Sequence, residues 1–422
     1  MIRTVILQQK EERDALLQRE YVERSNAIQS QDFLASDLIK LITGPRRAGK
    51  SVLALQLLKL KKFAYLNFDD ALLLKHFDEN AVMQLLLEIY PDFQYLLLDE
   101  IQNLPQWELW ATKLYRRGVN LVITGSNSKL LSSEMASLLT GRFIEINILP
   151  FSYAETLTFN NIAVTYETPA QKALLLQQLT EILKYGSFPE TVKSRSITRN
   201  YLSALYDSIL LKDIAKRFKI RNSGGLYDLA SYLLTNYCNP FSINQLAQAL
   251  NIGSAHTAKK FCEYLTEPYL FFYLSRYNNK LKLMKKAPQK VYVIDNGFIA
   301  AQSFELMESS GRLLENLVFV ELLRRGYNTT QTLFYYRSRN DKEIDFVCRD
   351  KHKITALIQV SYSLQNPKTY KREISALIEA REELYCDNLL LLTWDDERIV
   401  EESGAVITIK PVWKWLLYPP AM

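Results

Sequence analysis

The segment from Ile42 to Leu58, ITGPRRAGKSVLALQLL, narrows most strongly what this chain can fold into. The apolar run LIKLIT leads into a turn with two glycines and a Lys-Ser pair, and the helical pattern VLALQLLKL follows. Gly44, Gly49, Lys50 and Ser51 fit every fixed position of G-x-x-x-x-G-K-[ST]. A strand before the motif and a helix after it are the context in which such a loop binds nucleotide phosphates.

The residue types in this loop suit a phosphate chain. Gly44 and Gly49 allow backbone conformations that turn amide N–H groups toward phosphate oxygens, and the helix N-terminus adds partial positive charge. We expect Lys50 to reach the β- and γ-phosphates and the Ser51 hydroxyl to bind Mg²⁺. The residues expected to contact the nucleotide are Gly44, Pro45, Arg46, Arg47, Ala48, Gly49, Lys50, Ser51 and Val52.

A second candidate element is the run YLLLDE, which ends in two carboxylates about 50 residues after the glycine-rich loop. Asp99, at the end of the expected strand, would hold Mg²⁺ through a water molecule. Glu100 would act as the general base that polarises the attacking water. Many strands end in acidic residues, so these two acids alone would not indicate a catalytic site. Their position about 50 residues after the glycine-rich loop is what makes them candidates for metal binding and catalysis.

Two later segments add polar groups to the candidate site. In VITGSNS, Ser126 or Asn127 would orient the water or sense the γ-phosphate, although an ordinary polar turn has the same composition. In TGRF, Arg142 stands beside a further strand, and a cation near the γ-phosphate would stabilise transition-state charge. Arg142 could act in its own site or in that of a neighbouring subunit, or be a plain surface arginine.

Up to about residue 150, short apolar runs alternate with helical patterns. Such runs separated by helices are typical of parallel strands buried on both faces. The five runs are LIKLITG, FAYLNF, YLLLDE, VNLVITGS and FIEINIL. Residues 1 to about 35 have helical spacing, residues 152 to 235 are almost purely helical, and from about 310 the order is helix, strand, strand, helix, strand.

Composition excludes some classes of protein. No apolar run approaches the roughly 18 residues that a membrane span needs, and the N-terminus lacks the apolar core of a secretory signal, so we expect a cytoplasmic protein without a membrane partner. The four cysteines form no CxxC pair and only three histidines are present, so we expect buried thiols rather than zinc. The net charge of +6 permits a nucleic-acid partner without requiring one.

At this point the sequence resembles a prokaryotic family of AAA-type P-loop ATPases that carry a C-terminal nuclease-like domain of unknown function. The runs PFSYAE, YGSFPE and YVIDNGF point to this family, whereas the glycine-rich loop and the acid pair are shared by P-loop ATPases at large. The resemblance covers the chain from about residue 20 to its end. The matching runs are ITGPRRAGKS, YLNFDD, LLLDEIQNLPQWE, LVITGSNSKLLS, LLTGRFIEINILPFSYAE, YGSFPE, KVYVIDNGF, LLENLVFVELLRRG and DKEIDFV.

The resemblance implies an α/β protein with an additional-strand P-loop ATPase core, whose parallel sheet has the order 5-1-4-3-2. It also implies ATP as the nucleotide, a winged-helix-like unit and a C-terminal α/β domain like that of restriction endonucleases, the PD-(D/E)XK type. The expected divisions are an N-terminal helical segment (1–35), the ATPase core (36–152), a helical lid region (153–224), the winged-helix unit (225–300) and the nuclease-like domain (301–422).

The residues of the middle unit allow an independent test of this expectation. FSINQLAQALNIGSAHTAKKF contains a short helix with Ser242 as a plausible N-cap, a turn, and a second helix that carries Lys259 and Lys260. A β-hairpin containing NNKLKL, with Lys280 and Lys282, would form the wing. Two interpretations remain open: duplex DNA binding with the second helix in the major groove, or a structural unit used for domain packing.

The C-terminal domain carries only part of a nuclease pattern. Such a site needs acids around Mg²⁺ and a lysine near the attacking water. Glu315 and Asp345 fit the acids, but Gln359 and Ser361 replace the second acid and the lysine. Lys353 or Lys371 would have to approach from elsewhere. The sequence therefore argues against DNA cleavage and favours a structural, DNA-binding or partner-binding module.

The leading functional hypothesis is an ATP-hydrolysing switch or motor that acts with DNA, with a protein partner or through self-assembly. One alternative is a DNA-binding regulator in which ATP is only a ligand, but Glu100 argues against it because a pure binder needs no general base. The other is a nuclease gated by ATP, against which Gln359 and Ser361 argue.

Overall fold

The computed structural model describes residues 1–25, 27–126, 141–221, 223–302 and 310–418. The chain divides into two compact units, Met1–Pro150 with Glu267–Tyr269, and Phe151–Thr266 with Leu270–Met422. Among the described residues, no helix has the length and apolar character to span a membrane. All four cysteines are free and buried, as expected.

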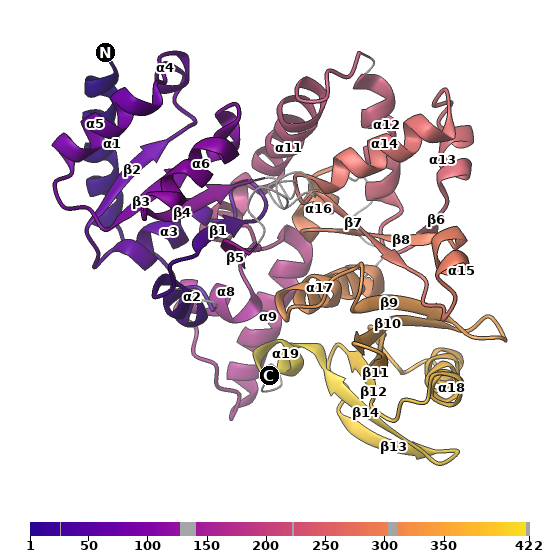
Figure 1. The fold of residues 1–422 in the computed structure, drawn as a ribbon. Coiled ribbons are helices and arrows are strands. Elements are labelled where there is room, and N and C mark those ends of the chain that lie inside the picture. Colours follow the sequence, from indigo (N-terminus) through magenta and orange to yellow (C-terminus); the bar gives the residue numbers. More distant parts are fainter. Residues whose placement is uncertain (26, 127–140, 222, 303–309, 419–422) are drawn as a thin grey trace. The chain divides into compact units, whose positions relative to one another are not determined.

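The first unit is built on a five-stranded parallel sheet (Figure 1). Its order, β2-β3-β4-β1-β5, is the expected 5-1-4-3-2 named from the opposite edge. Each strand coincides with one of the five apolar runs: β1 (Ile39–Thr43), β2 (Phe63–Asn67), β3 (Tyr95–Asp99), β4 (Asn120–Gly125) and β5 (Phe143–Asn147). Because all five strands run in parallel, their carboxyl ends lie at one edge of the sheet.

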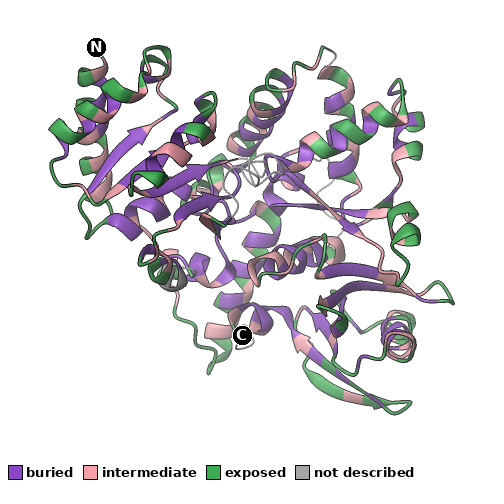
Figure 2. Cartoon of the chain, in the orientation of Figure 1, coloured by how far each residue is buried: buried purple, intermediate pink, exposed green. Residues whose placement is uncertain are grey.

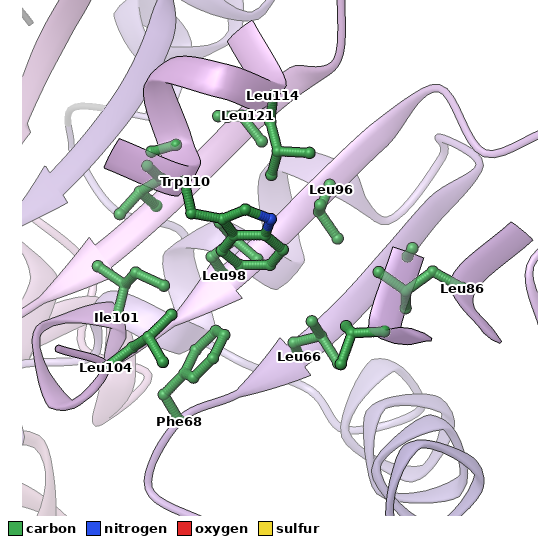
Figure 3. Close-up of a cluster of buried hydrophobic side chains, with 14 of the residues drawn as sticks. Leu66, Phe68, Leu86, Leu96, Leu98, Ile101, Leu104, Trp110, Leu114 and Leu121 are labelled. Carbon is green, nitrogen blue, oxygen red and sulfur yellow. The ribbon is translucent and has the colours of Figure 1, made fainter. Parts of the chain in front are cut away.

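Successive residues of the central strands pack against opposite layers of helices. Leu96 and Leu98 join one apolar cluster (Figure 3), and Leu97 joins the other. The first cluster receives side chains from α1 (Ile2–Leu17), α4 (Ala71–Lys75), α5 (Glu79–Ile89), η1 (Ile101–Asn103) and α6 (Trp107–Arg116). The second receives them from α2 (Ala27–Leu34) and α3 (Lys50–Leu58). Figure 2 shows the resulting sheet as buried along its centre.

The second unit begins with helices, as the sequence predicts for residues 152 to 235. Ser152 and Thr168 each form a capping box with the residue three positions later, which fixes where the first two helices begin. The helices are α8 (Tyr153–Phe159), α9 (Pro169–Tyr185), α10 (Pro189–Lys193), η3 (Arg195–Ile197), α11 (Thr198–Ser208), the π-helix η4 (Ile209–Lys216) and α12 (Ser223–Thr235).

A small three-stranded sheet follows, with two helices between its first and second strands. The strands β6 (Pro240–Phe241), β7 (Phe271–Ser275) and β8 (Gln289–Val293) pair in the order β6-β8-β7. The helices are α13 (Ile243–Ala249) and α14 (Ala255–Thr266). Ser242 caps α13 as predicted, since its side chain accepts from the backbone N–H of Gln245.

The expected hairpin is present in part, because β7 and β8 pair as antiparallel strands on either side of NNKLKL. The connection between them is not the expected extended tip, since the segment LKLMKK forms a short helix, α15 (Leu281–Lys286). Leucine, lysine and methionine all favour helix, whereas only β7 and β8 on either side have the apolar and β-branched residues of strands. Ala287 and Pro288 end this helix before β8 begins.

The C-terminal region has more strands than the sequence indicated. Three strands, not two, separate the first long helix from the second, and a further hairpin and helix end the region. The elements are α16 (Asn296–Gln302), α17 (Ser310–Arg324), β9 (Leu333–Arg337), β10 (Glu343–Asp350), β11 (Lys353–Val360), α18 (Pro367–Leu384), β12 (Leu389–Thr393), β13 (Arg398–Glu402), β14 (Ala405–Pro411) and α19 (Val412–Leu417). The strands form a mixed sheet of order β13-β14-β12-β11-β10-β9.

Candidate active site

The glycine-rich loop leaves the carboxyl end of β1 in a conformation that only glycine fits at its first position. Gly44 has φ 143°, and a Cβ atom there would lie 2.0 Å from the carbonyl oxygen of Ile148. Gly49 has φ 99° and directly precedes α3. Glycine reaches such φ values without steric cost, so both motif glycines have a conformational reason for their positions.

Lys50 points back into the loop instead of out into solvent. Its side chain is 3% exposed, and Nζ donates to the carbonyl oxygen of Pro45 at 3.1 Å. The same ammonium lies 3.6 Å from a carboxylate oxygen of Glu100. The loop lysine and the acid after β3 are therefore brought together, although 50 residues separate them in the sequence.

Asp99 is held at the end of β3 by hydroxyl groups from three neighbouring elements. Its carboxylate accepts from the Ser51 hydroxyl at 2.8 Å, from the Thr124 hydroxyl, and from the Tyr65 hydroxyl at 3.3 Å. Burial raises the pKa of Asp99, and the Thr124 and Ser51 hydroxyls act in the opposite direction. The two residues expected to share a metal ion, Ser51 and Asp99, are in direct contact.

Glu100 adopts a left-handed backbone conformation, with φ 52°, where the chain turns out of β3. Its backbone N–H donates to the Thr124 hydroxyl at 3.0 Å, and its carboxylate accepts from Gln102 Nε2 at 2.5 Å and from the Ser126 hydroxyl at 3.3 Å. Burial alone would raise the pKa of Glu100, but the Lys50 ammonium and these donors outweigh it and lower the pKa. Glu100 is consequently ionised near neutral pH and able to accept a proton.

Of the remaining candidates, Ser126 lies against Glu100, and Asn127 lies outside the described residues. Arg142 immediately precedes β5, and its carbonyl accepts from the backbone N–H of Ile39 at the amino end of β1. The glycine-rich loop follows the opposite end of β1, about 15 Å away at the usual rise per residue. The backbone therefore does not bring Arg142 to the loop of its own sheet, and a role in a neighbouring site stays a prediction.

Besides Gln102, which holds the Glu100 carboxylate, three residues of the site went unnoticed in the sequence. Thr124 and Tyr65 support Asp99 from the two strands beside β3. Arg24, which is 5% exposed, comes from the connection between α1 and α2 and donates to the carbonyl oxygens of Ala48 (2.8 Å) and Leu149 (2.5 Å). No local motif marks these residues, because each acts through a contact that is distant in sequence.

We expect Arg24→Ala to weaken nucleotide binding about tenfold, because hydrogen bonds from a charged donor contribute about 1.5–3 kcal/mol each and this pair fixes the loop carbonyl of Ala48. Titration with a fluorescent ATP analogue would measure the change. Arg19→Ala, at an exposed position of the same connection, is the matched control and should bind normally. Equal affinity of the two variants would contradict a positioning role for Arg24.

The structure also brings together some of the C-terminal candidates. Gln359 Oε1 accepts from the backbone N–H of Asp345 at 3.1 Å, whereas Lys353 is exposed at the far end of β11, about 20 Å along the strand. Lys371 is exposed on α18. Glu315, Glu343 and Asp345 form an acid cluster around Lys290, and neither lysine that the sequence suggested is part of it.

Comparison with known proteins agrees with this geometry. A family model described as an AAA domain matches residues 36–157, and two models for domains of unknown function match residues 176–308 and 310–414. An uncharacterized protein of Methanocaldococcus jannaschii is 36% identical over 403 residues, which are 91% of this chain and 89% of that protein. The chain belongs to this family of AAA-type P-loop ATPases.

A second member of the family is an uncharacterized protein of Haemophilus influenzae, 33% identical over 361 residues, 81% of this chain and 87% of that protein. Among solved structures, the Walker-type ATPase of Pyrococcus abyssi aligns with a TM-score of 0.44 at 14% identity, covering 68% of this chain and 99% of that one. The Orc1 protein of Aeropyrum pernix, solved in complex with DNA, aligns with a TM-score of 0.31 at 12% identity, covering 74% and 97%.

Proposed function

We propose that this AAA-type ATPase binds ATP with Mg²⁺ and hydrolyses it, and that the turnover drives a switch or motor coupled to DNA or to a protein partner. One observation carries the proposal: the Ser51–Asp99 hydrogen bond and the Lys50–Glu100 pair lie together at the carboxyl edge of the sheet. In this proposal the Ser51 hydroxyl and the buried Asp99 would hold the metal ion, and the Lys50 ammonium would bind phosphate. Glu100 would act as the base beside the same loop.

The residues present fit a magnesium ion. Mg²⁺ prefers oxygen ligands and keeps several waters, and Ser51 Oγ and the Asp99 carboxylate offer oxygens to such an ion. When bound, the ion would neutralise negative charge on the phosphate oxygens. The left-handed glycines and the start of α3 supply the loop amides and the positive helix end that suit a phosphate chain.

The other groups have distinct roles in this proposal. Lys50 would exchange its bond to the Pro45 carbonyl for a phosphate oxygen. Glu100 would take a proton from the attacking water, while Gln102 and Ser126 hold its carboxylate in position. Thr124 would keep Asp99 and Glu100 in register, since it donates to one and accepts from the backbone of the other.

Steady-state ATP hydrolysis by the purified chain tests this proposal. We expect turnover that requires Mg²⁺ and that falls by orders of magnitude in Lys50→Ala, because the phosphate-binding ammonium is lost. The proposed switch or motor function would be wrong if the protein bound ATP without turnover at all protein concentrations and with DNA present. The chain would then be an ATP-liganded binding module.

The unit around α13 and α14 is the proposed DNA reader. Lys259 and Lys260 are exposed on α14, and the four lysines at 280, 282, 285 and 286 are exposed around α15. Lysines that neutralise phosphates release counterions and so give binding that weakens with salt. A short helix followed by a turn and a second helix is an arrangement that can enter the major groove.

We expect the double variant Lys259→Glu/Lys260→Glu to lose stimulation of ATP hydrolysis by duplex DNA while basal turnover changes less than about twofold. ATPase rates at several DNA and salt concentrations would measure this. The control is Lys351→Glu/Lys353→Glu, which changes two exposed lysines at the turn between β10 and β11. Loss of stimulation only in the control would move the DNA surface to the C-terminal region, and absence of any stimulation would exclude DNA coupling.

A further inference from the structure

A fully buried lysine lies at the centre of the C-terminal acid cluster. Lys290, on β8 of the three-stranded sheet, is 1% exposed. Its Nζ atom lies 2.9 Å from Glu315, 2.7 Å from Glu343 and 3.1 Å from Asp345. These carboxylates belong to α17 and β10, so the ammonium joins two elements of the C-terminal α/β region to the sheet before it.

The ammonium uses its full hydrogen-bonding capacity in this position. A lysine has three N–H donors, and three carboxylates lie within bonding distance. The carboxylates have further partners of their own: the Tyr292 hydroxyl for Glu315 (2.7 Å), Arg337 for Glu343 (3.2 Å) and the backbone N–H of Val360 for Asp345 (2.9 Å). The cluster is therefore a completed polar network.

Charge balance keeps the lysine in its cationic form. Burial by itself lowers the pKa of Lys290, but the carboxylates of Glu315, Asp345 and Glu343 outweigh it and raise the pKa above its ordinary value. Burial of Asp345 among acids raises the pKa of that carboxyl. The Lys290 ammonium thus offsets the free-energy cost of burying the three acids beside it.

Gln359 completes the same arrangement. Its amide Nε2 donates to Glu373 at 2.6 Å, while its Oε1 accepts from the backbone N–H of Asp345. A carboxylate in place of this amide would set two acids against each other at the same short distance. Gln359, which replaces the second acid of the nuclease pattern, can therefore donate a hydrogen bond to Glu373, whereas a carboxylate could not.

We propose that the Lys290 ammonium occupies the cation position between Glu315 and Asp345, so that the acid cluster is a metal-independent clasp between the β6-β8-β7 sheet and the C-terminal α/β region. A divalent ion cannot share this position. Mg²⁺ needs oxygen ligands at about 2.0–2.1 Å and keeps water molecules, and the ammonium already takes one oxygen from each acid.

The test compares thermal unfolding of the full chain with and without Mn²⁺, in nucleotide-free protein. A Ser51→Ala background in every variant removes the cation site of the glycine-rich loop. Lys290→Met keeps the length of the side chain but removes its charge. Lys282→Met, at an exposed position of α15, is the matched control.

We expect Lys290→Met to lower the Tm by about 10 °C in EDTA, because it leaves buried acids uncompensated, and the control to lower it by less than about 2 °C. Millimolar Mn²⁺ should leave the Tm of the parent unchanged, because the ammonium already occupies the position between the acids. A Lys290→Met Tm equal to that of the control would overturn the clasp.

A second measurement does not depend on the folding of Lys290→Met. Electron paramagnetic resonance counts bound Mn²⁺ in the Ser51→Ala parent and in Ser51→Ala/Asp345→Asn. The proposal requires the same count in both chains. A bound ion that disappears with Asp345→Asn would show that the cluster takes a metal with Lys290 in place, and the proposal would be wrong.

Discussion

Replacing Glu100 with glutamine is expected to lower the rate of ATP hydrolysis by roughly 10²- to 10⁴-fold, the usual contribution of a positioned general base. The amide keeps the shape of the side chain and its contacts with Gln102 and Ser126, but it cannot accept a proton at neutral pH. ATP affinity should persist or rise, because Lys50 no longer has a carboxylate 3.6 Å away. Phosphate release under saturating ATP measures the rate, and analogue titration measures the affinity.

Comparison with Lys50→Ala in the same assays separates the effect on ATP binding from the effect on hydrolysis. Lys50→Ala should lose both ATP affinity and turnover, whereas Glu100→Gln should lose turnover alone. Glu11→Gln, an exposed acid on α1, controls for the loss of one negative charge. If Glu100→Gln turned over at the parental rate, Glu100 would not be the base, and the base would have to come from another group.

The second large effect concerns Gly186, in the run YGSFPE. Its backbone has φ 74° and ψ −170°, a region that is essentially closed to other residues. A Cβ atom there would lie 1.7 Å from a carboxylate oxygen of Asp295 and 2.8 Å from the backbone nitrogen of Gly297. We expect Gly186→Ala to destabilise the second unit by about 4 kcal/mol or more, and to lower its Tm by roughly 10 °C.

The effect is large because Asp295 has nowhere to move. This carboxylate is 4% exposed and accepts from the backbone N–H of Ser187 at 2.7 Å and from that of Gly297 at 2.8 Å. Burial raises the pKa of Asp295 to about 6, although these donors act to lower it. Displacement would leave this carboxyl buried without its hydrogen bonds, which is costly.

Differential scanning calorimetry of Gly186→Ala measures the loss of stability. Gly253→Ala, at an exposed turn with nothing within 4 Å of the added atom, should cost less than about 1 kcal/mol, and a similar loss in both variants would contradict this account.

The sequence predicted the ATPase sheet well, because each of its strands is a continuous apolar run and helices separate the first four of them along the chain. It also identified the motif around Lys50 and the acids Asp99 and Glu100, since those residue types have fixed spacing relative to strands. The runs YGSFPE and YVIDNGF indicated the family, but no physical reason for them could be read from the sequence. The structure shows that Gly186 of the first run packs directly against Asp295 of the second.

What the sequence missed depends on contacts that no local pattern encodes. Lys290 stands in a lysine-rich stretch and resembles a solvated residue, yet acids 25 and 55 positions later make its burial possible. Arg24 and Thr124 likewise act only once distant segments have folded together. The helix α15 was missed for a different reason, because it follows local helix preference in the connection of the hairpin that β7 and β8 form.

The N-terminal segment shows that a domain defined by sequence similarity can be smaller than the physical unit. The AAA match begins at residue 36, but Val5 and Ile6 belong to the apolar cluster on one face of the sheet, and Arg24 bonds the glycine-rich loop. A fragment cut at residue 36 would leave part of that face exposed to water and would lack the guanidinium behind the loop. Studies of an isolated ATPase domain should therefore begin at Met1, so that a loss of activity on truncation is not mistaken for a need for the rest of the chain.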